Sequence, residues 1–104
     1  MSLKGSEKKY LRGLAHGLKP LVQVGRRGVT DDLVASVDLA LGDHELIKVR
    51  FLEFKDEKKA LSGEIAEKTG SELVGRIGNI AVFFRQHPDP AKRKVRRSPS
   101  SGKP

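Results

Sequence analysis

With 104 residues, 37% of them hydrophobic, and a formal net charge of +8, the chain can bury the core of one domain and favours polyanionic partners. It contains no cysteine, which excludes a disulfide framework and thiolate chemistry and fits a reducing compartment. No apolar stretch is long enough to span a membrane and no signal peptide opens the sequence, so we expect a soluble cytoplasmic protein.

The first predicted element is a helix over residues 6–16. Ser6 is a common N-cap residue, Glu7 suits the positive end of the helix dipole, and Gly17 can end the helix. Apolar residues at helical spacing form its buried side: Tyr10, Leu11, Leu14 and Ala15. A second face, either solvated or part of a nucleic-acid footprint, carries residues four apart: Lys8, Arg12 and His16.

A short strand, a glycine loop and a second helix are predicted next. Pro20 forces an extended conformation on the residue before it and opens a strand over residues 21–24. This strand lacks alternation, which predicts that both of its faces are covered. The loop Gly25-Arg26-Arg27-Gly28 follows. Thr30 is a good N-cap for a helix that we expect to end at Gly42, with one apolar face: Leu33, Val34, Val37, Ala40 and Leu41.

The clearest predicted strand spans residues 45–53. Its apolar side chains alternate with polar ones, as in a half-buried strand, and the inward residues are Ile47, Val49 and Phe51. Lys48 and Arg50 then lie on its outer face. This basic face either extends a phosphate-binding track or is an ordinary solvated sheet face, and the sequence favours neither.

A third helix and a hairpin complete the predicted domain. The helix covers residues 57–69, with Asp56 as its N-cap and Gly70 at its end; its inward residues are Ala60, Leu61, Ile65 and Ala66. Strands over residues 72–77 and 80–85 are joined by Gly78-Asn79. The order of elements, αβαβαββ, predicts a single α/β (α+β) domain over residues 1–87 with three helices and one mixed four-stranded sheet.

Positive charge is concentrated at the two ends of the chain. Residues 1–27 carry seven Lys or Arg against one Glu (+6), residues 28–87 eight against eleven acidic residues (−3), and residues 88–104 six against one (+5). The last of these stretches is proline-rich and lacks periodicity, which predicts a disordered basic tail. Such asymmetry favours a polyanion that binds on one side of the protein.

The loop from Gly25 to Gly28 is the strongest candidate binding motif. Glycines allow a sugar-phosphate backbone to approach the main chain. The first amides of the following helix, together with Arg26 and Arg27, can point at one phosphate. KH domains clamp a single strand with a comparable Gly-x-x-Gly loop. Asp31 and Asp32 oppose this, because they compete for the same helix end. The alternative is an ordinary tight turn with exposed arginines.

Catalysis has little support in the residues. His16, His44 and His87 are scattered without a spacing suited to zinc. Asp31-Asp32 could ligate magnesium in a nuclease, but helix capping explains them without further assumptions. The aromatic residues fall mostly at core positions, which argues against a base-stacking surface: Tyr10, Phe51, Phe54, Phe83 and Phe84. We therefore expect no enzyme activity, metal site or cofactor.

Four segments, Tyr10–His16, Leu18–Thr30, His44–Arg50 and Arg76–Arg85, resemble in order the YhbY family, the bacterial stand-alone form of the CRM domain (chloroplast RNA splicing and ribosome maturation). The resemblance spans about residues 4–87. It implies a fold similar to the C-terminal domain of bacterial translation initiation factor three, RNA binding without catalysis, association with precursors of the large ribosomal subunit, and a role in ribosome assembly.

The resemblance also implies site residues. The family's glycine loop and basic first helix map onto these positions: Gly25, Arg26, Arg27 and Gly28, and Lys8, Lys9 and Arg12. Two features depart from the family pattern. Phe83-Phe84-Arg85 replaces a frequent aliphatic-Tyr-Arg ending, and the basic tail after Pro88 lies outside the shared pattern.

Our leading hypothesis is a monomeric ribosome-assembly factor that grips ribosomal RNA on one side, through the loop and the first helix. The expected contact residues are Lys8, Lys9, Arg12, Gly25, Arg26, Arg27, Gly28, Lys48 and Arg50. A protein-interaction module whose basic tail binds RNA non-specifically is the alternative.

Overall fold

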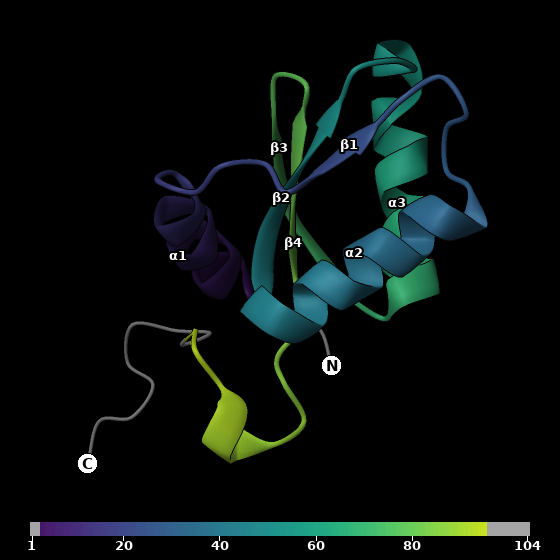
Figure 1. Cartoon of the computed structure of the whole chain (residues 1–104). Coiled ribbons are helices and arrows are strands. Elements are labelled where there is room, and N and C mark those ends of the chain that lie inside the picture. The colour runs from purple at the N-terminus through teal and green to yellow at the C-terminus, as the bar shows by residue number, and fades with distance from the viewer. Residues whose placement is uncertain (1–2, 96–104) are drawn as a thin grey trace.

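Four strands form one mixed sheet in the computed structural model, which describes residues 3–95 (Figure 1). The strands are β1 (Val22–Val24), β2 (Leu46–Phe51), β3 (Glu72–Ile77) and β4 (Ile80–Phe84). Their order across the sheet is β1-β2-β4-β3. β1 runs parallel to β2, whereas β4 lies antiparallel between β2 and β3. The predicted element order, mixed sheet and hairpin are confirmed.

Helices cover the two faces of this sheet unequally. α1 (Gly5–Ala15) packs on one face, and α2 (Asp31–His44) and α3 (Lys58–Thr69) pack on the other (Figure 1). Side chains alternate along β2 and so contribute to two apolar clusters. Ile47, Val49 and Phe51 belong to the cluster under α2 and α3, and Leu46 belongs to the cluster under α1, called the α1 cluster below. Within residues 3–95, no helix has the length and apolar character needed to cross a membrane.

Three predicted helix boundaries were wrong. Ser6 lies inside α1 rather than capping it, because the helix begins at Gly5. The residue at the N-cap position is Lys4, whose backbone N–H donates to Glu7 Oε1 at 2.8 Å. α2 continues through Gly42 to His44. Asp56 lies in a single 3₁₀ turn, Lys55–Glu57, that precedes α3 and takes the place of a side-chain cap. The end of α3 at Gly70 is confirmed, with a left-handed φ of 64°.

β1 is an edge strand with one open face. Val22 and Val24 are buried, but Gln23 between them is exposed. The prediction of a strand covered on both faces was therefore wrong, because the apolar run extends only over alternate positions that face α2. The strand also begins one residue later than predicted, and Leu21 is exposed.

The segment after β4 is held by a buried carboxylate. Glu45 is 1% exposed and its oxygens accept three backbone N–H groups, from His87 at 2.6 Å, Lys94 at 2.5 Å and Val95 at 2.8 Å. Pro90–Lys92 forms a 3₁₀ turn between these contacts. The prediction of disorder from Pro88 onward is thus wrong for residues 88–95. Its remainder, residues 96–104, lies outside the described residues.

Candidate nucleic-acid interface

The Gly25–Gly28 loop is a tight turn at the exit of β1. The N–H of Gly28 donates to the carbonyl of Gly25 at 3.0 Å, and Gly28 has a φ of +70°. That conformation requires glycine, because other L-residues are strained there. A Cβ placed on Gly25, in contrast, would meet nothing within 4 Å. The turn therefore requires glycine at position 28, whereas no contact among the described residues requires glycine at position 25.

The start of α2 supplies free backbone donors beside this turn. Thr30 caps the helix as predicted, since its hydroxyl accepts the N–H of Leu33 at 3.1 Å. Among residues 3–95, the N–H groups of Val29, Asp31 and Asp32 have no protein acceptor. Such groups at a helix N-terminus can bind an anion. The two exposed aspartates oppose this attraction, as the sequence indicated.

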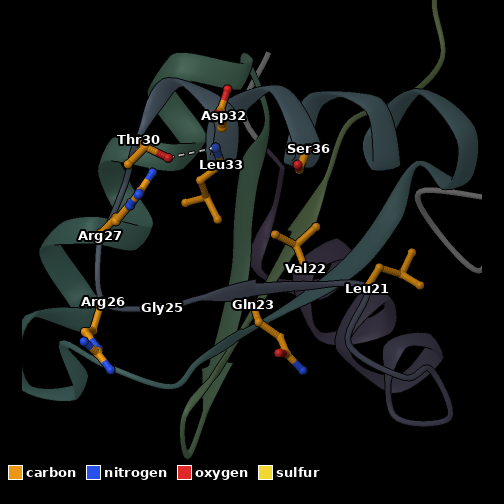
Figure 2. A pocket seen from close by; sticks show the side chains of 11 residues that line it. Leu21, Val22, Gln23, Gly25, Arg26, Arg27, Thr30, Asp32, Leu33 and Ser36 are labelled. Carbon is orange, nitrogen blue, oxygen red and sulfur yellow. Dashed lines mark hydrogen bonds between the residues drawn. The ribbon is translucent and has the colours of Figure 1, made fainter.

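A groove of about 450 Å³ runs along the open edge of β1, between that strand and α2. Its lining includes all four residues of the loop (Figure 2). Arg27 extends toward Thr30, whereas Arg26 points away from it (Figure 2). Both side chains are exposed, and neither has a hydrogen-bond or ion-pair partner within the described part of the chain. The two guanidinium groups therefore diverge and reach separate points, not one phosphate.

Two other predicted contact residues, Arg12 and Lys48, lie together on the α1 side of the sheet. Arg12, His16 and Lys48 border a small hollow of about 140 Å³ with an apolar floor. Lys48 Nζ donates to the carbonyls of His16 at 3.3 Å and Leu18 at 3.0 Å, and so closes the end of α1. Arg50 is exposed two residues further along the same face of β2.

Arg12 has a structural role that the sequence did not reveal. Its Nη1 donates to the carbonyl of Val74 at 3.0 Å. The aliphatic part of the side chain lies over Gly75, where a Cβ would be only 2.4 Å from Arg12 Cδ. Arg12 thus holds α1 against β3, and part of its hydrogen-bonding capacity is already used inside the protein.

The predicted one-sided surface is split between two faces of the sheet. α1 packs over β2, β3 and β4, whereas the groove follows β1 and α2. Lys8, which is half-buried, and Lys9, which is exposed, therefore lie across the sheet from the groove. Gln23 connects the two sides, because it lines the groove and is the register partner of Arg50. Of the predicted cations outside the loop, the structure brings Arg50 nearest to this connection.

Phe54 is one of the aromatic residues that we expected mostly at core positions, but it lies at the surface. Its side chain is 40% exposed, and its ring atom Cε2 would be 3.4 Å from a Cβ on Gly28. The ring therefore lies beside the loop. A signal was present in the sequence: an inward position after Phe51 would fall on residue 53, so Phe54 breaks the alternation of β2.

Arg85 joins three elements. Its Nη1 contacts Asp38 Oδ1 at 2.5 Å and the carbonyl of Thr69 at 2.8 Å, and its Nη2 contacts the carbonyl of Asp38 at 3.0 Å. The residue before it, Phe84, is buried against the α1 cluster. This arginine thereby fixes the end of β4 to α2 and to the last turn of α3.

The histidine and acidic side chains of residues 3–95 form no group of three or more that could hold a metal ion. Asp31 and Asp32, which we considered as magnesium ligands, are exposed in the first turn of α2. Their position is the one that favourable interaction with the helix dipole predicts.

Comparison with known proteins places this geometry in a family. The model of the CRS1 / YhbY (CRM) domain matches residues 3–85. A Pseudomonas aeruginosa protein named "Probable RNA-binding protein PA4753" is 39% identical over 93 residues, which cover 88% of this chain and 89% of that protein. A Haemophilus influenzae protein named "RNA-binding protein" is 36% identical over 85 residues, which cover 81% and 86% of the two chains.

A solved structure confirms the fold. The solution structure of the Staphylococcus aureus protein SAV1595 matches with a TM-score of 0.78 at 36% sequence identity. The match covers 91% of this chain and 100% of that one. Sequence and fold agree over nearly all of the described residues, and the chain belongs to the CRS1 / YhbY (CRM) domain family.

Proposed function

We propose that this protein binds RNA through the Gly25–Gly28 loop and the groove along β1. The observation that carries the proposal is the open loop itself. It combines a glycine that the fold does not require with free amides at the start of α2 and two arginines, and within residues 3–95 neither these amides nor these arginines have a protein partner. A sugar-phosphate backbone needs close approach, N–H donors and cationic side chains, and this loop offers all three.

The contrast with other cations supports the assignment. Arg12, Lys48 and Arg85 donate to carbonyl groups of the protein and so stabilise contacts between elements. Arg26 and Arg27 stabilise no such contact among the described residues. Because they diverge, we expect them to contact different phosphates of one strand. Arg50, reached through Gln23, extends the path onto the open part of the sheet.

The proposed RNA is ribosomal. The resemblance to the bacterial YhbY proteins supports a role in assembly of the large ribosomal subunit, and the names of the two relatives support RNA as the partner. On this proposal the protein acts in the cytoplasm as a monomer, without catalysis. Crosslinking to RNA in cell extract, followed by mapping of the crosslinked nucleotides, tests the ribosomal target. Crosslinks spread over messenger RNA, with none on ribosomal RNA precursors, would contradict it.

The loop is tested by changing Arg26 and Arg27 together to Ala. Each lost phosphate contact lowers the slope of log K against log salt concentration by about 0.7–0.9, so the double variant should lose about 1.4–1.8 in slope and bind every RNA sequence more weakly. Fluorescence anisotropy with labelled RNA over a range of salt concentrations measures both quantities. The matched control is Lys68→Ala with Arg76→Ala, which removes the same charge from exposed positions on α3 and on β3, the edge strand farthest from β1.

Two outcomes would contradict the role of the loop. One is a folded double variant whose affinity and slope equal those of the unchanged protein. The other is an equal loss in the Lys68 and Arg76 control, which would mean that only net charge matters. The alternative of a tail that binds RNA alone is tested by Lys92→Ala, Arg96→Ala and Arg97→Ala together. These changes keep the backbone N–H groups that Glu45 accepts, so loss of all affinity would assign RNA binding to the tail.

A further inference from the structure

An exposed aromatic ring borders the proposed RNA-binding loop. Phe54 follows β2 and adopts left-handed backbone angles, φ 58° and ψ 37°. A non-glycine residue is uncommon there, and this conformation costs about 1–2 kcal/mol. The edge of the ring rests on Gly28, as the 3.4 Å approach of Cε2 to its Cβ position shows. A residue in a strained conformation thus carries the phenyl ring that lies next to the loop.

The ring does not serve the hydrophobic core. Phe54 belongs to neither of the two apolar clusters, and 40% of it stays in contact with solvent. Leu52, two residues earlier, is also exposed, at 47%. Together, Leu52 and Phe54 form an apolar ledge at the end of the sheet where the loop lies. Packing against Gly28 uses one edge of the ring and leaves the remaining exposed surface unexplained.

Charge near the ledge selects what can bind there. Leu52 and Phe54 line a hollow together with three carboxylates and one lysine, namely Glu53, Asp56, Glu57 and Lys55, whereas Lys58 donates to the carbonyl of Gly78. This hollow therefore exerts no net attraction on a phosphate. The arginines of the loop supply the attraction for the backbone of a nucleic acid, and Leu52 and Phe54 supply apolar and aromatic surface. A nucleobase matches that surface, because every base has a π-face that stacks on an aromatic ring.

We propose that Phe54 stacks on an unpaired nucleobase of the RNA strand whose phosphates contact the Gly25–Gly28 loop. This inference rests on the proposed function and specifies its ligand as single-stranded RNA, in a loop, bulge or free strand. In a duplex the bases are paired and stacked inside the helix, so they cannot lie on a side chain beside the phosphate site. Stacking on one aromatic residue typically changes affinity by about 5- to 150-fold.

The chain offers a direct spectroscopic test, because it contains no tryptophan. Phe54→Trp introduces a single indole at the ledge. We expect its fluorescence to be quenched by a short single-stranded oligoadenylate and left unchanged by an RNA duplex of the same length. Leu39→Trp is the matched control, since Leu39 is 68% exposed on α2 and does not line the groove. Equal quenching by the duplex, or equal quenching in the control, would overturn the proposal.

Affinities separate stacking from simple packing. Phe54→Tyr should keep single-strand affinity, whereas Phe54→Leu and Phe54→Ala should lower it by about 5- to 150-fold without changing the salt slope, because no ionic contact is lost. Leucine retains an apolar side chain against Gly28 but lacks a π-face. Full affinity in Phe54→Leu would therefore show that the ring only supports the loop, and would overturn the proposal. Circular dichroism verifies that each variant is folded.

The two proposals fail in distinguishable ways. If the Arg26 and Arg27 double variant loses affinity and salt slope while Phe54→Leu binds normally, the loop binds RNA and the stacking proposal is wrong. If neither variant changes RNA affinity, both proposals are wrong. A ledge that binds a protein partner while the loop binds RNA would appear as the first pattern.

Discussion

Substitution of Glu45 by Ala tests how the segment after β4 is attached. Glu45 lies between α2 and β2, and its side chain is the acceptor for the backbone N–H groups of His87, Lys94 and Val95. Removing the carboxylate leaves these three donors without their partner. Because the segment can then detach, we expect residues 87–95 to become solvent-accessible while the sheet and the three helices remain folded.

The expected loss of stability follows from the contacts. A hydrogen bond from a neutral donor to a charged acceptor contributes about 1.5–3 kcal/mol. We use the lower value, because released N–H groups regain water, and three such bonds give about 4.5 kcal/mol. Removing the buried charge offsets part of this amount. A net decrease of about 3 kcal/mol in the free energy of unfolding corresponds to a decrease of roughly 12–24 °C in Tm for a domain of this size.

Thermal unfolding followed by circular dichroism measures that decrease, and amide hydrogen exchange locates it. The N–H groups of His87, Lys94 and Val95 should be protected in the unchanged protein and should exchange rapidly in Glu45→Ala. Glu53→Ala is the matched control, because that carboxylate is exposed, and its effect should stay within about 0.5 kcal/mol. A double-mutant cycle with removal of residues 88–104 should show strong non-additivity, since the two changes disrupt the same contacts.

A Tm within about 2 °C of the unchanged protein would refute the reasoning, because it would mean that the three bonds contribute almost nothing. Continued protection of the Lys94 and Val95 amides in the variant would also refute it. In that case the packing of Val95 on the α1 cluster, and not the carboxylate, would hold the segment in place.

Two further predictions concern residues that the fold and the site use differently. Gly28→Ala should decrease the free energy of unfolding by about 1–2 kcal/mol because of the φ of +70°, whereas Gly25→Ala should leave stability unchanged and weaken RNA binding. Urea unfolding measures the stability of both variants and fluorescence anisotropy their RNA affinity; equal losses of stability would contradict the distinction. Arg85→Lys should lower the free energy of unfolding by about 2 kcal/mol, because lysine cannot reproduce the contacts to Asp38 and Thr69. Its RNA affinity should stay unchanged; a loss of affinity at unchanged Tm would instead place Arg85 in the RNA interface.

Local sequence signals predicted the parts of the fold that have local causes. The alternation around Val49 identified β2, because a half-buried strand imposes a period of two on its side chains. Thr30 and Gly70 marked helix ends correctly, since capping depends on the side chain or φ of a single residue. The helix end predicted at Gly42 was wrong, because a glycine inside a helix costs only about 1 kcal/mol and the burial of Leu41 outweighs that cost.

Features that depend on distant partners could not be predicted. The side chain of Glu45 binds His87 and Val95, which follow it by 42 and 50 positions in the sequence. No periodic pattern predicts contacts over such separations. The loop itself was found from sequence, but its relation to α1 was not. Periodicity tells which side of a helix is buried, not which face of the sheet the helix covers, so the split between Arg26 and Lys9 emerged only from the topology. Phe54 was missed because a turn, and not the strand pattern, decides where its ring points.

The short edge strand β1 has a consequence for self-association. The carbonyl of Val24 accepts the N–H of Leu52 at the end of β2. Main-chain groups alternate in direction along a strand, so within β1 those of Gln23 face the open edge of the sheet, where another strand could pair with them. The strand is only three residues long, and Pro20 and Gly25 flank it. The edge therefore offers too few unpaired main-chain N–H and C=O groups for a second copy of the protein to extend the sheet. The groove can thus stay open for RNA without making the protein prone to aggregate through that edge.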